Sequence, residues 1–343
     1  MKPLLLAALT GAALALPQSP TPLSIKATCT TPKLRKSWSK ATTAEKTAYL
    51  NAAVCVTKKP SRLNNNGNST LHDDFAIVHA KLFPVIHDFA GFLPWHRFFM
   101  TVYEKALHDC GYTGTAMYWD WVADSPAPTK AAVWDPVTGF GGNGATTRDK
   151  DGRRCVTDGP FKNYRPVYYN EEVQPHCLSR EWYQDDPLSN IIDMGNSSYT
   201  PEVVNGILGI SVFDDFRRDL EGGPHAAIHR GVGFGSGDMG FQNASPNGEL
   251  SPVLELGLKL GFGALLTFWI DPLFFLHHTQ VDRLWWLWQQ KAPQTRTNEY
   301  SGLRLDYETQ VSLNDVMPMA GLAADAVVKD YMDVKGGTLC YTY

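Results

Sequence analysis

The chain has 343 residues, of which 43% are hydrophobic and 19% are charged, and its formal net charge is -4 at pH 7. This length and apolar content suit one large core, and no linker separates two compositions, so we expect a single domain. No cluster of lysine and arginine residues stands out, which argues against a nucleic-acid partner.

The first residues have the pattern of a secretory signal peptide. Lys2 precedes an apolar run from Leu4 to Leu16, and Ala13 and Ala15 are small residues that suit cleavage. The run is too short to span a bilayer comfortably, so we prefer secretion to a single membrane anchor. We predict a signal peptide over 1–15 and one domain over 16–343.

The cysteine content agrees with an extracellular location, because secreted thiols usually oxidise in pairs. We expect three disulfides, whose pairing the sequence leaves open, and no C-x-x-C is present to suggest a cysteine-ligated zinc. The sequons at Asn68 and Asn196 would allow glycosylation. The six cysteines are Cys29, Cys55, Cys110, Cys155, Cys177 and Cys340.

Helical periodicity dominates the chain, and sustained two-residue alternation is scarce. Thr42 and Glu45 form a capping box for the first helix, and Pro84 and Pro94 should end the second and open the third. The stretch 121–199 is rich in Gly, Pro, Asn and Asp and should form loops over the core. Helices are predicted over 42–56, 71–83, 94–107, 214–230 and 272–290.

Several of the ten histidines fall where helix geometry would turn them inward. His79 shares a stripe with Phe75 and Leu82, and His96 lies on the apolar face of its own helix. A single inward histidine is more often a hydrogen-bonded core residue than a metal ligand.

The second half of the chain repeats this feature. His225 and His229 are four residues apart, Glu221 lies one turn before them, and the doublet His277-His278 follows a helix start at Asp271. Inward histidines on four amphipathic helices, beside aromatic residues and away from cysteines, favour copper or zinc bound in a helix bundle. Six ligands would suit two metals, and the spacing alone leaves His277 and His278 undecided.

The stretch "HDFAGFLPWHR" fits this interpretation. Ligand imidazoles must be neutral, held in one tautomer and shielded from water. The apolar run between His87 and His96 is expected to supply that shield.

The motifs "HDFAGFLPWHRFF", "CGYTGTAMYWDW", "PHAAIH" and "DPLFFLHHTQVDRLWW" resemble those of the type-3 copper tyrosinase and catechol oxidase family, in particular short secreted fungal polyphenol oxidases. The resemblance runs from about Cys29 to Tyr343. It implies a mainly α fold, with a four-helix bundle that holds a dicopper centre, long surrounding loops and few short strands.

By position, the resemblance implies three histidine ligands for each copper. In the family the ligand is the second histidine of the doublet, so His278 is preferred and His277 lies behind it. His72, His108 and His176 match no ligand position, and His176 looks structural. The implied ligands are His79, His87 and His96 for the first copper, and His225, His229 and His278 for the second.

The resemblance also implies a reaction, in which an o-diphenol is oxidised to an o-quinone while dioxygen is reduced to water. Glu221 matches the acidic residue that holds a water near the second copper, and Ala226 stands where efficient hydroxylating members have Asn. Since Ala cannot share that hydrogen bonding, diphenol oxidation is favoured over monophenol hydroxylation. Phe274 matches the gate residue above the first copper; the alternative is that it only packs in the core. Arg230 would orient acidic phenols; the alternative is that its side chain is only solvated.

The sequence departs from the family in three places. Val85 replaces a cysteine that many relatives cross-link to a ligand histidine, so no such thioether is expected. The chain stops at the Tyr341-Thr342-Tyr343 motif, so no proteolytic unmasking is expected. An extra stretch, 248–270, is either an apolar helix or lid near the site or, as we hypothesise, a retained intron.

We therefore expect a secreted dicopper polyphenol oxidase that acts on small phenols with dioxygen, without a nucleic-acid or membrane partner. The alternatives are a tyrosinase that hydroxylates monophenols, a non-catalytic oxygen-binding protein and an inactive homologue.

Overall fold

The structure of the chain is a computed structural model that describes residues 29–64, 67–169, 172–186, 188, 191–234, 237–240, 270–306 and 308–343. The predicted signal peptide and residues 248–269 of the extra stretch lie outside the described residues. Ile270 lies within them, and it is buried.

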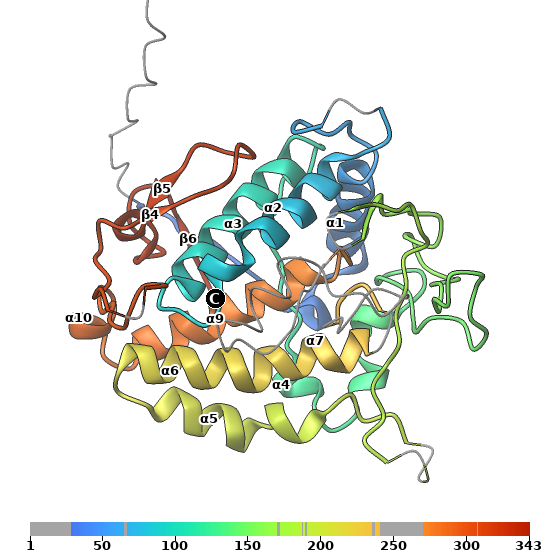
Figure 1. Cartoon of the computed structure of the whole chain (residues 1–343). Coiled ribbons are helices and arrows are strands. Elements are labelled where there is room, and N and C mark those ends of the chain that lie inside the picture. Colours follow the sequence, from blue (N-terminus) through green and yellow to red (C-terminus); the bar gives the residue numbers. More distant parts are fainter. Residues whose placement is uncertain are drawn as a thin grey trace, which may run out of the picture.

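The described chain is mainly helical with long loops and few short strands, as predicted (Figure 1). The α-helices are α1 (Thr43–Val56), α2 (Leu71–Ile86), α3 (Phe92–His108), α4 (Trp121–Asp124), α5 (Pro201–Gly209), α6 (Phe213–Leu220), α7 (Ala226–Gly233), α9 (Phe274–Gln290) and α10 (Pro293–Arg296). A π-helical turn, η5 (Glu221–His225), joins α6 to α7. Single 3-10 turns are η1 (Trp38–Lys40), η2 (Pro128–Lys130), η3 (Ala132–Trp134), η4 (Asn196–Tyr199) and η6 (Val328–Tyr331).

The strands pair two by two. β1 (Lys33–Leu34) runs parallel to β6 (Tyr341–Thr342), and two antiparallel pairs join β2 (Tyr168–Tyr169) to β3 (Glu172–Val173) and β4 (Val316–Met317) to β5 (Ala326–Val327). The β1–β6 pair brings the first and last described segments together, next to the Cys29–Cys340 disulfide. The other disulfides are Cys55–Cys110 and Cys155–Cys177, so all six cysteines are paired as expected.

The predicted helix limits were right in outline and wrong at several ends. Thr42 caps α1 through the predicted capping box with Glu45. The α2 helix continues through Pro84 instead of ending there, because only one hydrogen bond is lost near its end and Ile86 packs into the core. The α3 helix begins at Phe92, two residues before Pro94, whose missing N–H falls in the first turn where it has no helical partner.

The last two helices also differ from their predictions. The helix predicted over 214–230 is interrupted by η5, where Gly222, Gly223 and Pro224 favour a widened turn. The α9 helix begins at Phe274 and not at Pro272, because Asp271 lies outside the helix and forms a buried salt bridge with Arg180. No helix was predicted at α5, although Thr200 caps it and Pro201 opens it.

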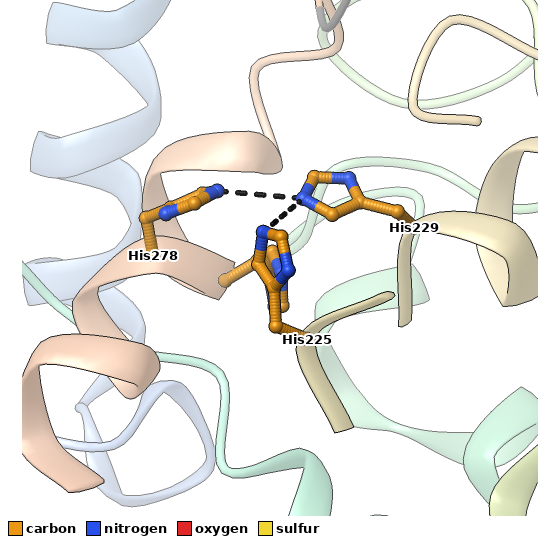
Figure 2. Close-up of side chains that lie close together, drawn as sticks. His225, His229 and His278 are labelled. Atoms are coloured by element: carbon orange, nitrogen blue, oxygen red, sulfur yellow. Dashed lines mark hydrogen bonds between the residues drawn. The ribbon is translucent and has the colours of Figure 1, made fainter. Parts of the chain in front are cut away.

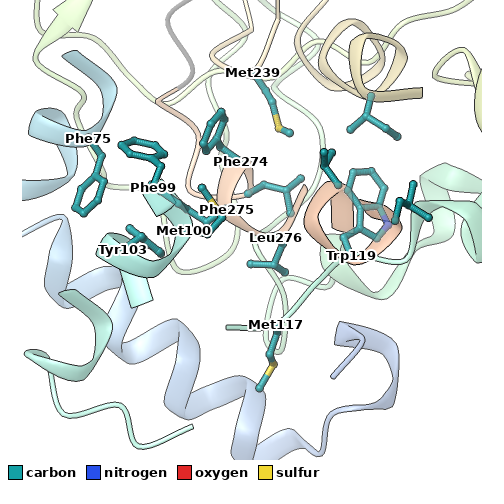
Figure 3. Packing of buried hydrophobic residues seen from close by; sticks show 14 of the residues in the cluster. Phe75, Phe99, Met100, Tyr103, Met117, Trp119, Met239, Phe274, Phe275 and Leu276 are labelled. Carbon is teal, nitrogen blue, oxygen red and sulfur yellow. The ribbon is translucent and has the colours of Figure 1, made fainter. Parts of the chain in front are cut away.

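Four helical segments surround the centre of the molecule: α2, α3, α9 and the rod formed by α6, η5 and α7 (Figure 1). Phe216 of α6 stacks on Trp288 of α9, and α3 packs along α9. Figure 3 shows how Phe75, Phe99 and Phe275 from three of these helices meet in the core. Within the described residues, no helix is long and apolar enough to cross a membrane.

One buried carboxylate ties the end of the chain to this bundle. Asp282 of α9 pairs with Arg97 of α3 at 2.5 Å and with Arg35 at 3.1 Å, and it accepts a hydrogen bond from Tyr341 at 2.6 Å and another from Tyr343. Because Asp282 lies one turn after His278, this network fixes the position of the helix that carries the histidine doublet.

Candidate metal centre

The first predicted histidine group comes together in the core. His79 lies inside α2, His87 follows the last residue of α2, and His96 lies in the second turn of α3; all three side chains are buried. One ring nitrogen from each lies within 4.8 Å of the others, and the Nε2 atoms of His79 and His96 are 3.2 Å apart. The distances fit a three-histidine metal site.

The second group is equally compact. His225 ends η5, His229 lies one turn later on α7, and His278 projects from α9 toward both. Figure 2 shows the three rings converging, with the Nε2 of His229 3.1 Å from that of His225 and 3.3 Å from that of His278.

Both histidines of the doublet His277-His278 lie close to His225 and His229. His277 also has a ring nitrogen within 4.8 Å of nitrogens of His225, His229 and His278. However, the Nε2 of His229 lies 3.1 Å from that of His225 and 3.3 Å from that of His278, whereas the ring of His277 stacks on that of His225 with centroids 5.3 Å apart. His278 therefore supplies the short Nε2 contact to His229, while the ring of His277 lies against the rings of His225 and His229, with centroids 5.3 Å and 4.5 Å away.

The two groups adjoin each other. The rings of His96 and His278 stack with their centroids 4.4 Å apart, and the rings of His87 and His225 lie 6.1 Å apart. Phe274 contacts both groups, since its ring centroid lies 4.2 Å from that of His278 and 5.2 Å from that of His79. The arrangement forms one paired site.

Hydrogen bonds fix the tautomers of three of these rings. The Nδ1 atoms of His96, His225 and His229 lie 2.8 Å, 2.9 Å and 3.0 Å from the carbonyl oxygens of Phe92, Glu221 and Met239. A carbonyl only accepts, so each Nδ1 carries the proton, and the Nε2 of each neutral ring presents a lone pair.

Burial keeps these rings neutral. It lowers the pKa of His225 to about 4, and burial together with neighbouring histidines holds the pKa values of His79, His87, His96, His229 and His278 well below the ordinary value. Two unprotonated nitrogens therefore face each other between His225 and His229 at 3.1 Å. Such lone pairs repel unless a cation lies between them.

A bound metal ion resolves that repulsion. Metal–imidazole bonds of about 2.0 Å at near-tetrahedral angles separate two ligand nitrogens by about 3.3 Å. The observed Nε2 separations of 3.1 Å to 3.3 Å agree with that spacing. By donor chemistry and by spacing, the residues fit a pair of metal ions.

Glu221 is buried between the two groups. Its Oε1 accepts a hydrogen bond from the backbone N–H of Asp88 at 2.9 Å, and its Oε2 pairs with Nη1 of Arg217 at 2.9 Å. Burial raises the pKa of Glu221 to about 8, although Arg217 and the Asp88 amide oppose that shift. Arg217 and Asp88 were not among the predicted site residues, although Arg217 precedes Glu221 by one helical turn.

The other residues singled out in the sequence differ in how far they are exposed to solvent. Ala226 is half-buried beside His225, Arg230 is exposed, and Val85 is 41% exposed. The histidines without a ligand role bond elsewhere: Nε2 of His72 with the carbonyl of Ile270 at 2.9 Å, and Nε2 of His176 with Asp238 at 3.0 Å.

Comparison with known proteins gives consistent results. The common central domain of tyrosinase matches residues 69–253 and 256–291. Tyrosinase ustQ of Aspergillus flavus is 37% identical over 319 residues, which cover 92% of this chain and 80% of that protein. Tyrosinase-like protein phomQ1' of Diaporthe leptostromiformis is 38% identical over 333 residues, with coverages of 92% and 80%.

A solved structure is also similar over nearly the whole chain. A polyphenol oxidase variant from Thermothelomyces thermophila superposes with a TM-score of 0.70 at 27% identity. The match covers 91% of this chain and 88% of that one.

Proposed function

The chain belongs to the tyrosinase family, and on this basis we propose that it is a secreted dicopper oxidase that converts o-diphenols to o-quinones with dioxygen. The observation that carries the proposal is the convergence of histidine Nε2 atoms in two adjoining groups, with spacings that suit metal ions. The copper ligands would be His79, His87 and His96 for one ion, and His225, His229 and His278 for the other.

When bound, copper supplies the Lewis acidity and the redox capacity that pass electrons from the phenol to dioxygen. The protein would supply neutral ligands, because burial keeps the imidazoles unprotonated and backbone carbonyls fix their tautomers. Aromatic rings such as Phe83, which stacks on His87 at 4.4 Å, would keep bulk water away from the ligands.

The surroundings of Glu221 support diphenol oxidation over monophenol hydroxylation. Arg217 and the Asp88 amide already bond to the two carboxylate oxygens of Glu221, so less of the carboxylate is left to hold and orient a water as proton acceptor. Ala226, next to His225, has no polar side chain to assist. Oxidation of a catechol inserts no oxygen atom, so this reaction depends less on such a base.

Two residues near the second histidine group are candidates for substrate contact. We propose that Phe274 packs against the phenol ring, since it already contacts rings of both groups. Exposed Arg230, which follows His229, would attract phenols with an acidic substituent.

The test is a copper analysis of the purified protein combined with steady-state oxygen uptake on a catechol and on the matching monophenol. Two copper ions per chain and faster turnover of the catechol are expected. Comparable initial rates on both substrates would favour a tyrosinase, bound copper without turnover an oxygen carrier, and absence of copper binding would refute the proposal.

A further inference from the structure

His87 is the one proposed ligand of the first group that does not lie inside a helix. It occupies the residue after α2, with φ -119° and ψ 158°, whereas His79 and His96 lie within α2 and α3. Its backbone N–H still bonds to the carbonyl of Phe83 at 3.2 Å. Beyond this bond, helical geometry does not determine where the His87 ring points.

The next residue has a backbone conformation that needs external support. Asp88 has φ 63°, in the left-handed region that residues other than glycine rarely adopt. Such conformations persist when surrounding contacts hold them. Here the Asp88 N–H donates to Oε1 of Glu221 at 2.9 Å, a contact between residues 133 positions apart.

Glu221 is itself held from its other side. Arg217 donates from Nη1 to Oε2 of Glu221 at 2.9 Å, and its Nη2 and Nε donate to Asp214 at 2.6 Å and 3.2 Å. The side chains of Arg217 and Glu221 are only 5% and 7% exposed. The carboxylate is therefore fixed in orientation, and it aims at the peptide that follows His87.

The same residue also contacts the second group through its main chain. The carbonyl oxygen of Glu221 accepts the hydrogen bond from Nδ1 of His225 at 2.9 Å. Glu221 thus orients His225 through its backbone and the His87 segment through its side chain.

We propose that Glu221, oriented by Arg217, is a positioning residue that holds His87 in place for the first copper. This inference rests on the proposed dicopper function. Glu221 reaches the His87 segment through its carboxylate, by way of the Asp88 N–H, but reaches His225 through its backbone carbonyl. Loss of the side chain therefore weakens the first copper site and leaves the second intact. Residues that position a metal ligand typically contribute about 10- to 100-fold in metal affinity.

The experiment compares full-length wild type with Glu221→Ala, Glu221→Gln, Arg217→Met and Asp88→Gly. Copper per chain is measured after equilibration with a graded series of chelators, and uncoupled Cu(II) is measured by electron paramagnetic resonance. Circular dichroism checks that each variant is folded, and exposed Arg218→Ala on α6 is the control.

In Glu221→Ala, one copper is expected to dissociate at a chelator concentration about 10- to 100-fold lower than in wild type, leaving an uncoupled Cu(II) signal. Glu221→Gln keeps an oxygen for the Asp88 N–H and should recover much of the affinity. Asp88→Gly keeps that N–H and suits φ 63°, so it should retain both ions, like Arg218→Ala. Arg217→Met should lower the copper affinity of the first site in the same way, but by a smaller factor.

Equal retention of both coppers by Glu221→Ala and wild type would overturn the positioning role while leaving the proposed function intact. Failure of wild type to bind copper would instead refute the proposed function. If Glu221→Ala does not fold, copper retention in Arg217→Met tests the positioning role instead. Retention of both coppers by Arg217→Met as strongly as by wild type would overturn the inference.

Discussion

The ring of His96 stacks on the ring of His278, with centroids 4.4 Å apart and 14° between the ring planes. One ring belongs to α3 and the other to α9, so the packing of these two helices sets the separation of the two histidine groups. The proposed dicopper site therefore depends on helix packing as much as on the ligands themselves.

The histidine doublet gives the sharpest test of ligand identity. His278→Ala should lose one of the two coppers, because it removes an Nε2 that lies 3.3 Å from that of His229. His277→Ala should retain both coppers, because the ring of His277 stacks on that of His225 and neither of its nitrogens has a hydrogen-bond partner, such as His229, among the described residues. Copper analysis of the two variants checks this, and the reverse result would assign the ligand to His277.

Copper removal should lower the thermal stability of the protein. A metal that binds the folded chain and not the unfolded one stabilises the folded chain by mass action. Without it, the facing lone pairs of His225 and His229 repel each other. We expect a lower Tm after chelation, restored by Cu²⁺ and also by Zn²⁺, while only copper restores catechol oxidation. An unchanged Tm would contradict a preformed metal site.

Asp282 should make the protein sensitive to acid. Burial alone would raise the pKa of this carboxyl, but Arg97 and Arg35 hold it below its ordinary value. A depressed folded pKa contributes stability that is present above the unfolded value of about 3.9 and is lost as the pH falls through the folded pKa.

The Asp282→Asn variant tests this contribution. Loss of one member of a buried pair costs about 3–5 kcal/mol, so the variant should be less stable at pH 7 and should lose less stability below about pH 4 than wild type. Urea unfolding at both pH values measures the difference, with exposed Asp219→Asn as the control. Parallel losses in Asp282→Asn and wild type would argue against Asp282 as the acid-sensitive group.

Ala226 should limit hydroxylation of monophenols. An amide at this half-buried position would add a hydrogen-bond acceptor beside His225. Since general bases contribute about 100- to 10,000-fold, Ala226→Asn is expected to raise the ratio of monophenol to catechol rates by about 10-fold through partial assistance. Ala226→Val, similar in bulk but apolar, is the control; an equal rise in both variants would point to a steric cause.

The extra stretch 248–270 is expected to be removable. Asp271, the first residue after this stretch, donates its N–H to the carbonyl of Asp238 at 3.3 Å, so described residues before and after the stretch are already close in space. A variant that lacks 248–270 should fold and bind two coppers. Sequencing of the spliced transcript tests the intron hypothesis directly, and a message that retains this stretch would end it.

The sequence by itself determined where most of the long helices lie and which of their faces are apolar, because period, capping boxes and prolines act locally. Thr42 with Glu45 predicted the start of α1, and the spacing of His225 and His229 placed both on one face. The motif resemblance further implied which histidines bind metal.

Only the tertiary structure decided how these faces meet. Helical spacing could not distinguish His277 from His278, since the choice depends on the distance from α9 to α7. The disulfide pairing and the bonds from Glu221 to Asp88 and Arg217 were not predicted either. Contacts between residues far apart in the chain arise from the packing of whole helices, and local sequence patterns do not predict that packing.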